Sequence, residues 1–363
     1  MIELKVQRGN ILIYRLFDVA EEIKLAEALM GGQRGPDRFN VAKNIDRALV
    51  MKNPPVSFSL GVRKIVIAER EVACEVLAKV RDFGVVTIIF QLPITPGTSW
   101  SELIALAAEL EEGNEVDRRA QEILPEILDQ IRPALIKESK PEVFEDYIIY
   151  YIEEFTTPVI ASQLPSQVDI AALLIAEHEV ALSEASKKLA MEYVFQYGDK
   201  DLAVVEWNSA IVIDPSGGRE IPDILEFAVS HLLEMRVYDD LLDEKLNILY
   251  NRIDDEQSKF FSSGRFDKVY KESSTRFIEF TEFIERVENS LKVVGDFYLA
   301  TVYRAAIRKF RMSDWQSSVT RKINILGQVS SLMQGEVNYR RSHFLEIIVV
   351  LLIAYEVVST FWR

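Results

Sequence analysis

The chain of 363 residues is poor in the side chains on which metal and redox chemistry depends. Cys74 is its only cysteine, which excludes an intrachain disulfide and a zinc site built on several cysteines. The run Glu71–Arg81 around it is amphipathic, and we expect it to be helical. We therefore interpret Cys74 as a buried, unreactive thiol.

Recognisable catalytic motifs are also missing. The sequence has no Gly-x-Ser-x-Gly element, and the glycine-rich stretch Gly31–Gly35 lacks the Gly-Lys-Ser/Thr ending of a phosphate-binding loop. His231 and Glu234 share a helix face, but the second pair that a two-metal site in a helix bundle needs is absent. We interpret His231 as a surface or capping residue. The sequence therefore indicates no catalytic, cofactor-binding or metal-binding residue and no small-molecule substrate.

Basic residues are outnumbered, with 42 Lys and Arg against 57 Asp and Glu, a net charge of −15. Such a balance opposes non-specific binding to nucleic acid or anionic lipid. The stretch Tyr303–Lys322 is a local exception, in which Asp314 is the single acidic residue among six basic ones: Arg304, Arg308, Lys309, Arg311, Arg321 and Lys322. These side chains either dock an acidic partner, such as RNA or a ribonucleoprotein, or offset the dipole at a helix end.

Residues 1–215 mix strands and helices, so we expect an α+β domain. Apolar runs predict strands at Ile11–Phe17, Val85–Leu92 and Tyr147–Ile152, and a helix follows the first of them. Gly61 lies between two short strand-like runs in the manner of a hairpin. Ser99-Trp100-Ser101-Glu102 predicts a helix start with a capping box.

For residues 216–339 the sequence pattern predicts helices only, joined by short breaks. Apolar residues recur at threes and fours after Pro222, a second helix is predicted from about Phe266 to Met312, and a third begins at Ser313. Long helices joined by short turns pack antiparallel, so we expect a helical hairpin or coiled-coil bundle that forms a stalk.

Residues 340–363 have the composition of a membrane anchor. The segment from Phe344 to Trp362 would form about 28 Å of helix, close to the roughly 30 Å of a hydrocarbon core. Twelve of its residues are Leu, Ile, Val or Phe. Glu346 can reach the interface, whereas Glu356 lies nearer the centre and opposes insertion by about 3 kcal/mol. The balance narrowly favours a transmembrane helix over a helix buried in a bundle or in an oligomer interface.

The flanks of this segment indicate its orientation. Arg340 and Arg341 precede it, as expected for a cytosolic N-terminal flank, and Tyr339 and Trp362 bracket it as interfacial aromatics do. The N-terminus has neither a secretory signal nor a transit peptide pattern. We expect a single-pass protein of the cell membrane with its N-terminal bulk in the cytoplasm. A carboxyl such as Glu356 in a span favours a neighbouring helix, and hence a homo-oligomer.

Two stretches resemble the "required for meiotic nuclear division" family. One is the run Arg321–Leu326 followed by LEIIVVLLIAYEVV from Leu345, in which Glu346 and the Glu356-Val357 pair match the family's pattern. The other is LAVVEWNSAIVI, with Trp207, where the family has an aromatic-rich strand. The resemblance covers mainly residues 200–363. It implies a membrane-tethered, self-associating protein without established enzymatic activity, whose organellar relatives hold ribosomes near a membrane.

The sequence thus favours a non-enzymatic, membrane-tethered and homo-oligomeric scaffold that needs no cofactor. Two alternatives stay open. One is a metal-dependent hydrolase that uses helix carboxylates, and the other is a small transport or channel subunit built around Glu356.

Overall fold

The computed structural model describes residues 3–361, except for 32–36, 39–52, 68–69, 142, 256–274, 276–277, 279–281 and 283–296. The chain divides into two compact units. The first comprises Met1–Val237 and Arg286–Ser313, and the second comprises Tyr238–Glu285 and Asp314–Arg363. The first unit is therefore discontinuous in sequence.

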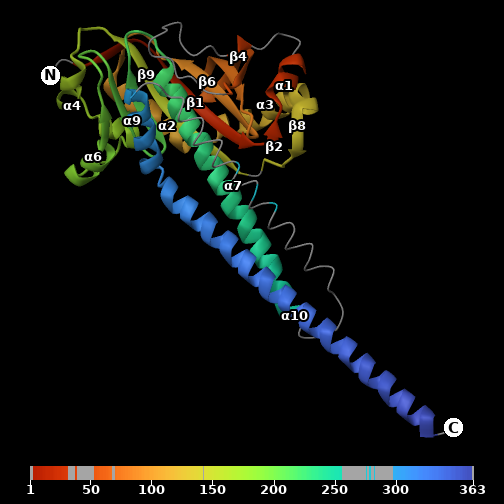
Figure 1. The fold of residues 1–363 in the computed structure, drawn as a ribbon. Coiled ribbons are helices and arrows are strands. Elements are labelled where there is room, and N and C mark those ends of the chain that lie inside the picture. The colour runs from red at the N-terminus through yellow and green to blue at the C-terminus, as the bar shows by residue number, and fades with distance from the viewer. Residues whose placement is uncertain are drawn as a thin grey trace. The chain divides into compact units, whose positions relative to one another are not determined.

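A large mixed sheet forms the centre of the first unit (Figure 1). Its strands are β1 (Lys5–Asp18), β3 (Asp37–Arg38), β4 (Val56–Ile67), β5 (Arg70–Val80), β6 (Val85–Pro93), β7 (Thr98–Ser99), β9 (Phe144–Phe155), β10 (Tyr193–Phe195), β11 (Leu202–Val205) and β12 (Ser209–Ile213). Their order is β10-β11-β12-β9-β1-β6-β5-β4-β3, with β7 also paired to β1. A separate two-stranded sheet joins β2 (Ala20–Ile23) to β8 (Leu135–Glu138).

One pair in the large sheet, β9 with β12, is parallel, and the other described pairs are antiparallel. A parallel neighbour requires a long crossover connection. Here the connection contains α4 (Leu164–Gln167), α5 (Ile170–Ile175), α6 (Glu184–Ala190) and the strands β10 and β11. The crossover therefore adds a layer of short helices and extends the sheet at one edge.

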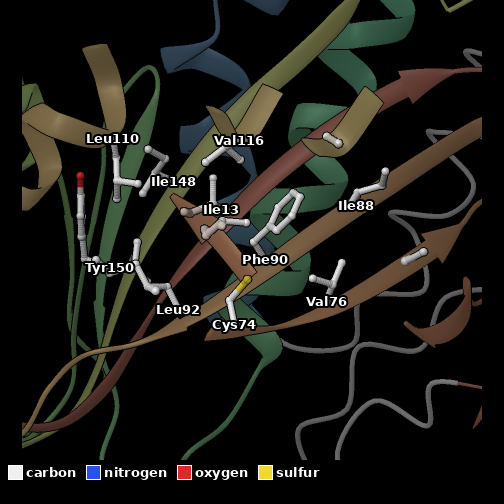
Figure 2. Packing of buried hydrophobic residues seen from close by; sticks show 14 of the residues in the cluster. Ile13, Cys74, Val76, Ile88, Phe90, Leu92, Leu110, Val116, Ile148 and Tyr150 are labelled. Atoms are coloured by element: carbon white, nitrogen blue, oxygen red, sulfur yellow. The ribbon is translucent and has the colours of Figure 1, made fainter. Parts of the chain in front are cut away.

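Helices α2 (Trp100–Glu112) and α3 (Glu115–Ile131) cover one face of the sheet. Leu110 of α2 and Val116 of α3 share a buried cluster with Ile13, Val76 and Phe90 of the strands (Figure 2). The predicted capping box at Ser99 is confirmed, because the Ser99 side chain accepts from the Glu102 backbone and the Glu102 side chain accepts from the Ser99 backbone. Smaller helices, α1 (Leu25–Gly31) and the 3-10 turns Arg132–Ala134 and Ala161–Gln163, complete the described local elements of this unit.

The opposite face packs against the beginning of α7 (Glu220–Asp255) and against α9 (Phe297–Lys309). The hydroxyl of Tyr151 donates to the carbonyl of Gly218 at 2.8 Å, just before α7. The ring of Tyr147 lies 5.7 Å from that of Phe310, just after α9. Because the central strands are buried on both faces, their sequences read as continuous apolar runs rather than alternating ones.

Two expectations for the first unit are wrong. Glu71–Arg81 is not a helix. Its residues up to Val80 belong to β5, because β4 and β6 provide hydrogen-bond partners on both sides of that strand. Cys74 is nevertheless buried there, with 1% exposed, and burial raises the pKa of its thiol to about 11. The expected hairpin at Gly61 is one strand, β4, with a bulge between Ser59 and Val62 where Gly61 takes a φ of +73°.

The second unit contains the rest of α7 together with α10 (Met312–Phe361). The ammonium of Lys322 lies 2.8 Å from Asp239 and 2.6 Å from Asp243, which places α10 beside α7. Val319, Ile323 and Leu326 are buried on α10. The helix predicted from Phe266 falls largely outside the described residues, and α9 is its described end. A coiled-coil bundle therefore stays a prediction.

Candidate functional site

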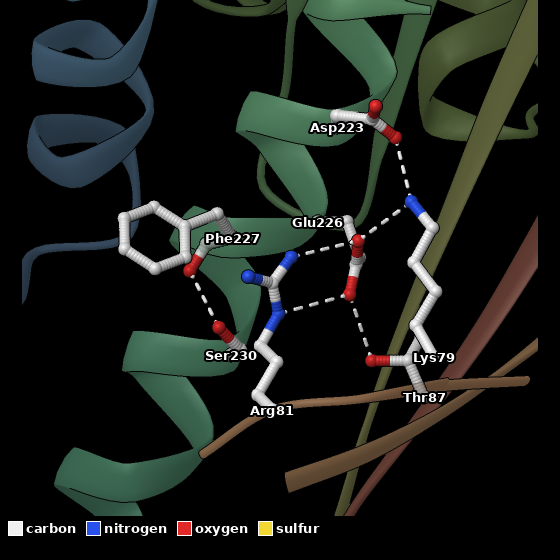
Figure 3. A network of polar contacts seen from close by, with 7 residues as sticks. All are labelled: Lys79, Arg81, Thr87, Asp223, Glu226, Phe227 and Ser230. Carbon is white, nitrogen blue, oxygen red and sulfur yellow. Dashed lines mark hydrogen bonds and ion pairs between the residues drawn. The ribbon is translucent and has the colours of Figure 1, made fainter. Parts of the chain in front are cut away.

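A network of charged side chains is buried between the sheet and α7 in the first unit (Figure 3). Lys79 of β5 and Thr87 of β6 are paired in register, so their side chains project from the same face. Asp223 and Glu226 stand three residues apart on α7, on the helix face that meets them. Each of these four residues is at most 6% exposed.

Glu226 is the centre of this network. It accepts from Lys79 Nζ at 3.0 Å, from Arg81 Nη2 at 2.9 Å and from Thr87 Oγ1 at 2.9 Å. Burial alone would raise the pKa of Glu226, but Arg81 and Lys79 outweigh it and hold that pKa at about 2. At Asp223, burial outweighs the attraction of Lys79 and raises the pKa. Glu226 is therefore held in its charged form between the two cations.

Most polar atoms of these groups satisfy one another inside the fold, whereas Asp223 Oδ2 has no hydrogen-bond partner among the described residues. Lys79 binds both carboxylates, at 2.6 Å from Asp223 and 3.0 Å from Glu226, and Arg81 binds Glu226 through two nitrogens. A buried pair arranged in this way fixes the position of one element on another, and removing one partner strands the other charge. We interpret the network as the attachment of α7 to the sheet.

His231 lies further along α7 and is also buried, with 2% exposed. Its Nδ1 is 2.6 Å from the hydroxyl of Tyr303 on α9, and its ring lies 4.4 Å from that of Phe227. Burial, helped by Arg81, lowers the pKa of His231 to about 3, so the ring is neutral. The expectation of a surface histidine is therefore wrong. Among the described residues, no three His, Cys, Asp or Glu side chains gather to hold a metal ion.

A surface pocket of about 430 Å³ lies at α4, the start of α5 and α6. Lys187 of α6 lines it and is bonded at 2.9 Å to Asp169, which also caps α5. The polar groups of this pocket thus join short helices to one another, and they do not point to a reaction.

The six basic residues predicted to bind a partner are divided between the two units. Arg304 and Arg308 are exposed in the first unit, four residues apart on one side of α9, and Arg311 is exposed in the turn that follows, where its φ is +50°. Lys309 instead points inward, with its side chain 8% exposed, 2.8 Å from Glu206 and 3.1 Å from the carbonyl of Leu189.

The other two basic residues belong to the second unit. Arg321 is exposed, and Lys322 binds Asp239 and Asp243. The three arginines Arg304, Arg308 and Arg311 are thus the part of the predicted set that α9 brings together on an exposed face. We call them the arginine stripe.

The end of α10 carries one stretch, Ser342–Ser359, that is long and apolar enough to cross a membrane. Its mean hydropathy is 1.8 and none of it is buried in the structure. Its large apolar side chains are exposed on every side of the helix, from 37% at Ile348 to 74% at Tyr355. A helix that is apolar all round needs an apolar environment on all its faces.

Of the predicted anchor residues, Phe344, Glu346 and Glu356 lie within Ser342–Ser359, whereas Trp362 lies outside the described residues. His343 Nδ1 is 3.4 Å from Glu346 Oε2, and the ring of His343 stacks on Tyr339 at 6.0 Å. Polar contacts are thus gathered where the apolar stretch begins.

The sequence offered a signal for the buried network that our reading missed. Lys79 lies at the buried end of β5 and Arg81 directly follows that strand, and Asp223 and Glu226 interrupt the apolar face of α7. Charges of opposite sign on two buried faces indicate a buried ion pair, because an isolated charge would be too costly there.

A mixed sheet with helices on both faces, continued by long helices of which one is apolar enough to span a membrane, defines the class of this protein. Residues 8–220 match the family described as "Uncharacterized protein MJ0711, N-terminal domain", and the chain belongs to that family. The Methanocaldococcus jannaschii protein "Uncharacterized protein MJ0711" is 24% identical over 238 residues, which are 65% of this chain and 72% of the relative.

These matches contradict the resemblance to the "required for meiotic nuclear division" family. The matched domain is the sheet domain, residues 8–220, whereas the resemblance depended mainly on residues 200–363. An apolar helix rich in Leu, Ile and Val is common to many unrelated proteins, so its composition does not identify a family.

Proposed function

We propose that this protein is a non-enzymatic, homo-oligomeric scaffold, tethered to the cell membrane by Ser342–Ser359, with its N-terminal bulk in the cytoplasm. The observation that carries the proposal is the complete exposure of this apolar stretch of α10. In water, that exposure leaves all of its apolar surface hydrated, which is unfavourable by about 25 cal/mol for each Å². Insertion into a bilayer removes this cost.

The energy of insertion supports the tether. Eighteen helical residues are about 27 Å long, close to the roughly 30 Å of a hydrocarbon core. Eleven of the eighteen are Leu, Ile, Val or Phe, which together contribute about −3 to −7 kcal/mol. Glu346 and Glu356 lie about 7 Å and about 8 Å from the middle of the stretch, so each costs less than the roughly 3 kcal/mol of a carboxylate at the centre.

The arginine stripe is the proposed docking surface for an acidic partner, such as a ribonucleoprotein. Its three guanidinium groups stand out from a chain whose net charge is −15. Arginine binds carboxylates and phosphates through two parallel hydrogen bonds, which makes it suited to either kind of acidic partner. Lys309 is excluded from this surface because it is bonded to Glu206.

Membrane fractionation tests the tether. We expect the full-length chain to remain in the membrane pellet after alkaline extraction, and a chain of residues 1–339 to appear in the supernatant. Mass spectrometry of what co-purifies with each form then identifies partners that depend on membrane location. Full-length protein in the supernatant would contradict the proposal.

A further inference from the structure

Exposed aromatic side chains of the first unit gather at α9. In the described part of that unit three aromatic residues are exposed, namely Phe297 at 82%, Tyr197 at 58% and Trp207 at 38%. Phe297 is the first residue of α9. The ring of Tyr197 lies 5.5 Å from that of Tyr298, and the ring of Trp207 lies 6.3 Å from that of Phe310, just after α9. Aromatic surface is thus presented to solvent at both ends of this helix.

The outward face of α9 carries cations as well. Phe297, Arg304 and Arg308 are exposed at spacings of seven and four residues, which is the repeat of one helix face, whereas Val302 and Ala306 are buried on the other side. The guanidinium of Arg304 lies 5.8 Å from the centroid of the Phe297 ring. Within the described parts of the chain, no carboxylate is bonded to Arg304 or Arg308. Their positive charge is therefore available to a ligand.

The acidity of the whole chain does not exclude an anion at this face. At physiological ionic strength, exposed charges act over about 8 Å, so the groups around a site decide its charge. Residues 297–313 contain no Asp or Glu. Two carboxylates beside the aromatic rings are engaged within the fold: Glu206 is bonded to Lys309 at 2.8 Å, and Asp201 accepts from the backbone nitrogen of Tyr197 at 2.7 Å. The outward face of α9 is therefore positive.

We infer that this face binds single-stranded RNA, with an unpaired base stacked on Phe297 and phosphates bonded to the arginine stripe. The inference rests on the docking role proposed for the stripe and names its partner. Arginine matches phosphate oxygens with paired N–H donors, and an exposed ring provides a stacking surface for a base. An acidic peptide needs the guanidinium groups alone, and a duplex has no unpaired base to stack. Rings and cations on one face thus favour a single strand, and RNA is the nucleic acid with unpaired segments in the cytoplasm.

Fluorescence anisotropy of the full-length protein in detergent micelles tests this inference. The probes are a labelled oligouridylate of about 12 nucleotides, an RNA duplex of the same length and a polyglutamate peptide of the same length. We expect the oligouridylate to bind most tightly. Its logarithmic affinity should fall with logarithmic salt concentration at a slope of about −2, as three phosphate contacts predict. Arg308→Ala removes one contact, so the slope should become about −1.4.

Phe297→Ala isolates the contribution of stacking. Because this residue is 82% exposed, its replacement should leave the fold intact. We expect oligouridylate affinity to fall by about 5- to 150-fold, the loss of one stacked base, and polyglutamate affinity to stay unchanged. Phe297→Tyr keeps an aromatic ring and should retain wild-type affinity. Tyr339→Ala removes an exposed ring of α10, away from the stripe, and should change the binding of no probe.

The outcomes separate the inference from the proposal on which it rests. Oligouridylate binding that survives Phe297→Ala unchanged, or that the duplex equals, would overturn the inference. Polyglutamate binding that is lost in Arg308→Ala, without binding of oligouridylate, would also overturn it, but would retain the stripe as a docking surface for an acidic protein. If neither probe binds, both the inference and the docking role fail. Membrane fractionation scores the tether separately.

Discussion

The ammonium nitrogen of Lys79 lies 2.6 Å from a carboxylate oxygen of Asp223, although 144 residues separate them in the chain. The contact joins strand β5 to helix α7 within the first unit. With Glu226 and Arg81 it forms a balanced set of two cations and two carboxylates, enclosed between helix and sheet. The attachment of α7 thus depends on charge pairing as well as on apolar packing.

Removing the central carboxylate should destabilise the sheet domain. Glu226→Gln leaves Lys79 and Arg81 buried with too little negative charge, and we expect the free energy of unfolding to fall by about 3 kcal/mol or more. Urea denaturation of the full chain in detergent micelles measures this loss. The exposed pair Lys64–Glu71 supplies the control, because Glu71→Gln breaks a solvated ion pair and should leave the transition unchanged. Equal effects of the two variants would show that the buried network contributes nothing.

Acid should destabilise the domain through His231. Its pKa is about 3 in the folded state and 6.5 in the unfolded chain, so only the unfolded chain binds the proton between these values. The contribution is fully present above pH 6.5 and is lost as pH falls toward 3. Between pH 7 and pH 5 we expect a loss of about 2 kcal/mol, which His231→Gln should remove.

The control for this pH dependence is His178→Gln, since His178 is exposed. Unfolding free energies at pH 7, 6 and 5 provide the comparison between the two variants. A wild-type slope that persists in His231→Gln would assign the acid sensitivity to other groups.

Gly84 should not tolerate a side chain. Its φ is +96°, and an added Cβ would lie 1.7 Å from the carbonyl oxygen of Ala20. Gly97 has a similar φ of +89°, but a Cβ there meets no described atom within 4 Å. Gly97→Ala should therefore cost only the backbone strain of about 1 to 3 kcal/mol, and Gly84→Ala clearly more. Thermal unfolding of both variants distinguishes the steric clash from the strain, and equal losses would exclude the clash.

A charge at the middle of the apolar stretch should release the protein from membranes. Val350→Lys replaces a favourable contribution by a cost of about 2.5 to 3.5 kcal/mol, which is comparable with the whole gain of insertion. We expect most of the variant in the soluble fraction. Thr320→Lys, at an exposed position of α10 outside the stretch, should stay in the pellet. Retention of Val350→Lys would mean that Ser342–Ser359 does not cross the bilayer.

Reversing the arginine stripe should abolish binding of the acidic partner. The variant carries Arg304→Glu, Arg308→Glu and Arg311→Glu, and its circular dichroism should match that of the wild type because these side chains are exposed. Quantitative mass spectrometry of co-purified material, at low and high salt, measures the loss. The control variant carries Arg70→Glu, Lys188→Glu and Lys200→Glu. These three residues are exposed elsewhere in the first unit, and their replacement changes the net charge by the same amount. Partner loss in both variants would indicate a general electrostatic effect.

The strands that the sequence predicted well are those with covering layers on both faces. Val85–Leu92 and Tyr147–Ile152 are mostly apolar because helices lie on each side of β6 and β9. Strand β5 was mistaken for a helix because Glu, Ala, Leu and Lys favour helices in isolation. Its alternation of Cys74, Val76, Ala78 and Val80 on the buried face was the stronger signal.

The site was less predictable than the fold. The apolar stretch of α10 follows directly from composition, since insertion depends on length and hydropathy. Whether a given basic residue is exposed or bonded within the fold does not follow from composition. Lys309 and Arg308 are neighbours in sequence, yet Lys309 is bonded to Glu206 and Arg308 is exposed. Which side of a helix packs inward is decided by contacts with elements distant in the chain.

The discontinuity of the first unit has a consequence for biosynthesis. Val302, Tyr303 and Phe310 are buried in that unit, although they follow Val237, where its first segment ends. The sheet domain therefore cannot close over these residues until α9 has left the ribosome. Synthesis of the residues from Ser313 to Ser342 takes only about 1.5 to 6 s at 5 to 20 residues per second. Domain closure and synthesis of the apolar stretch of α10 are thus nearly simultaneous events in translation.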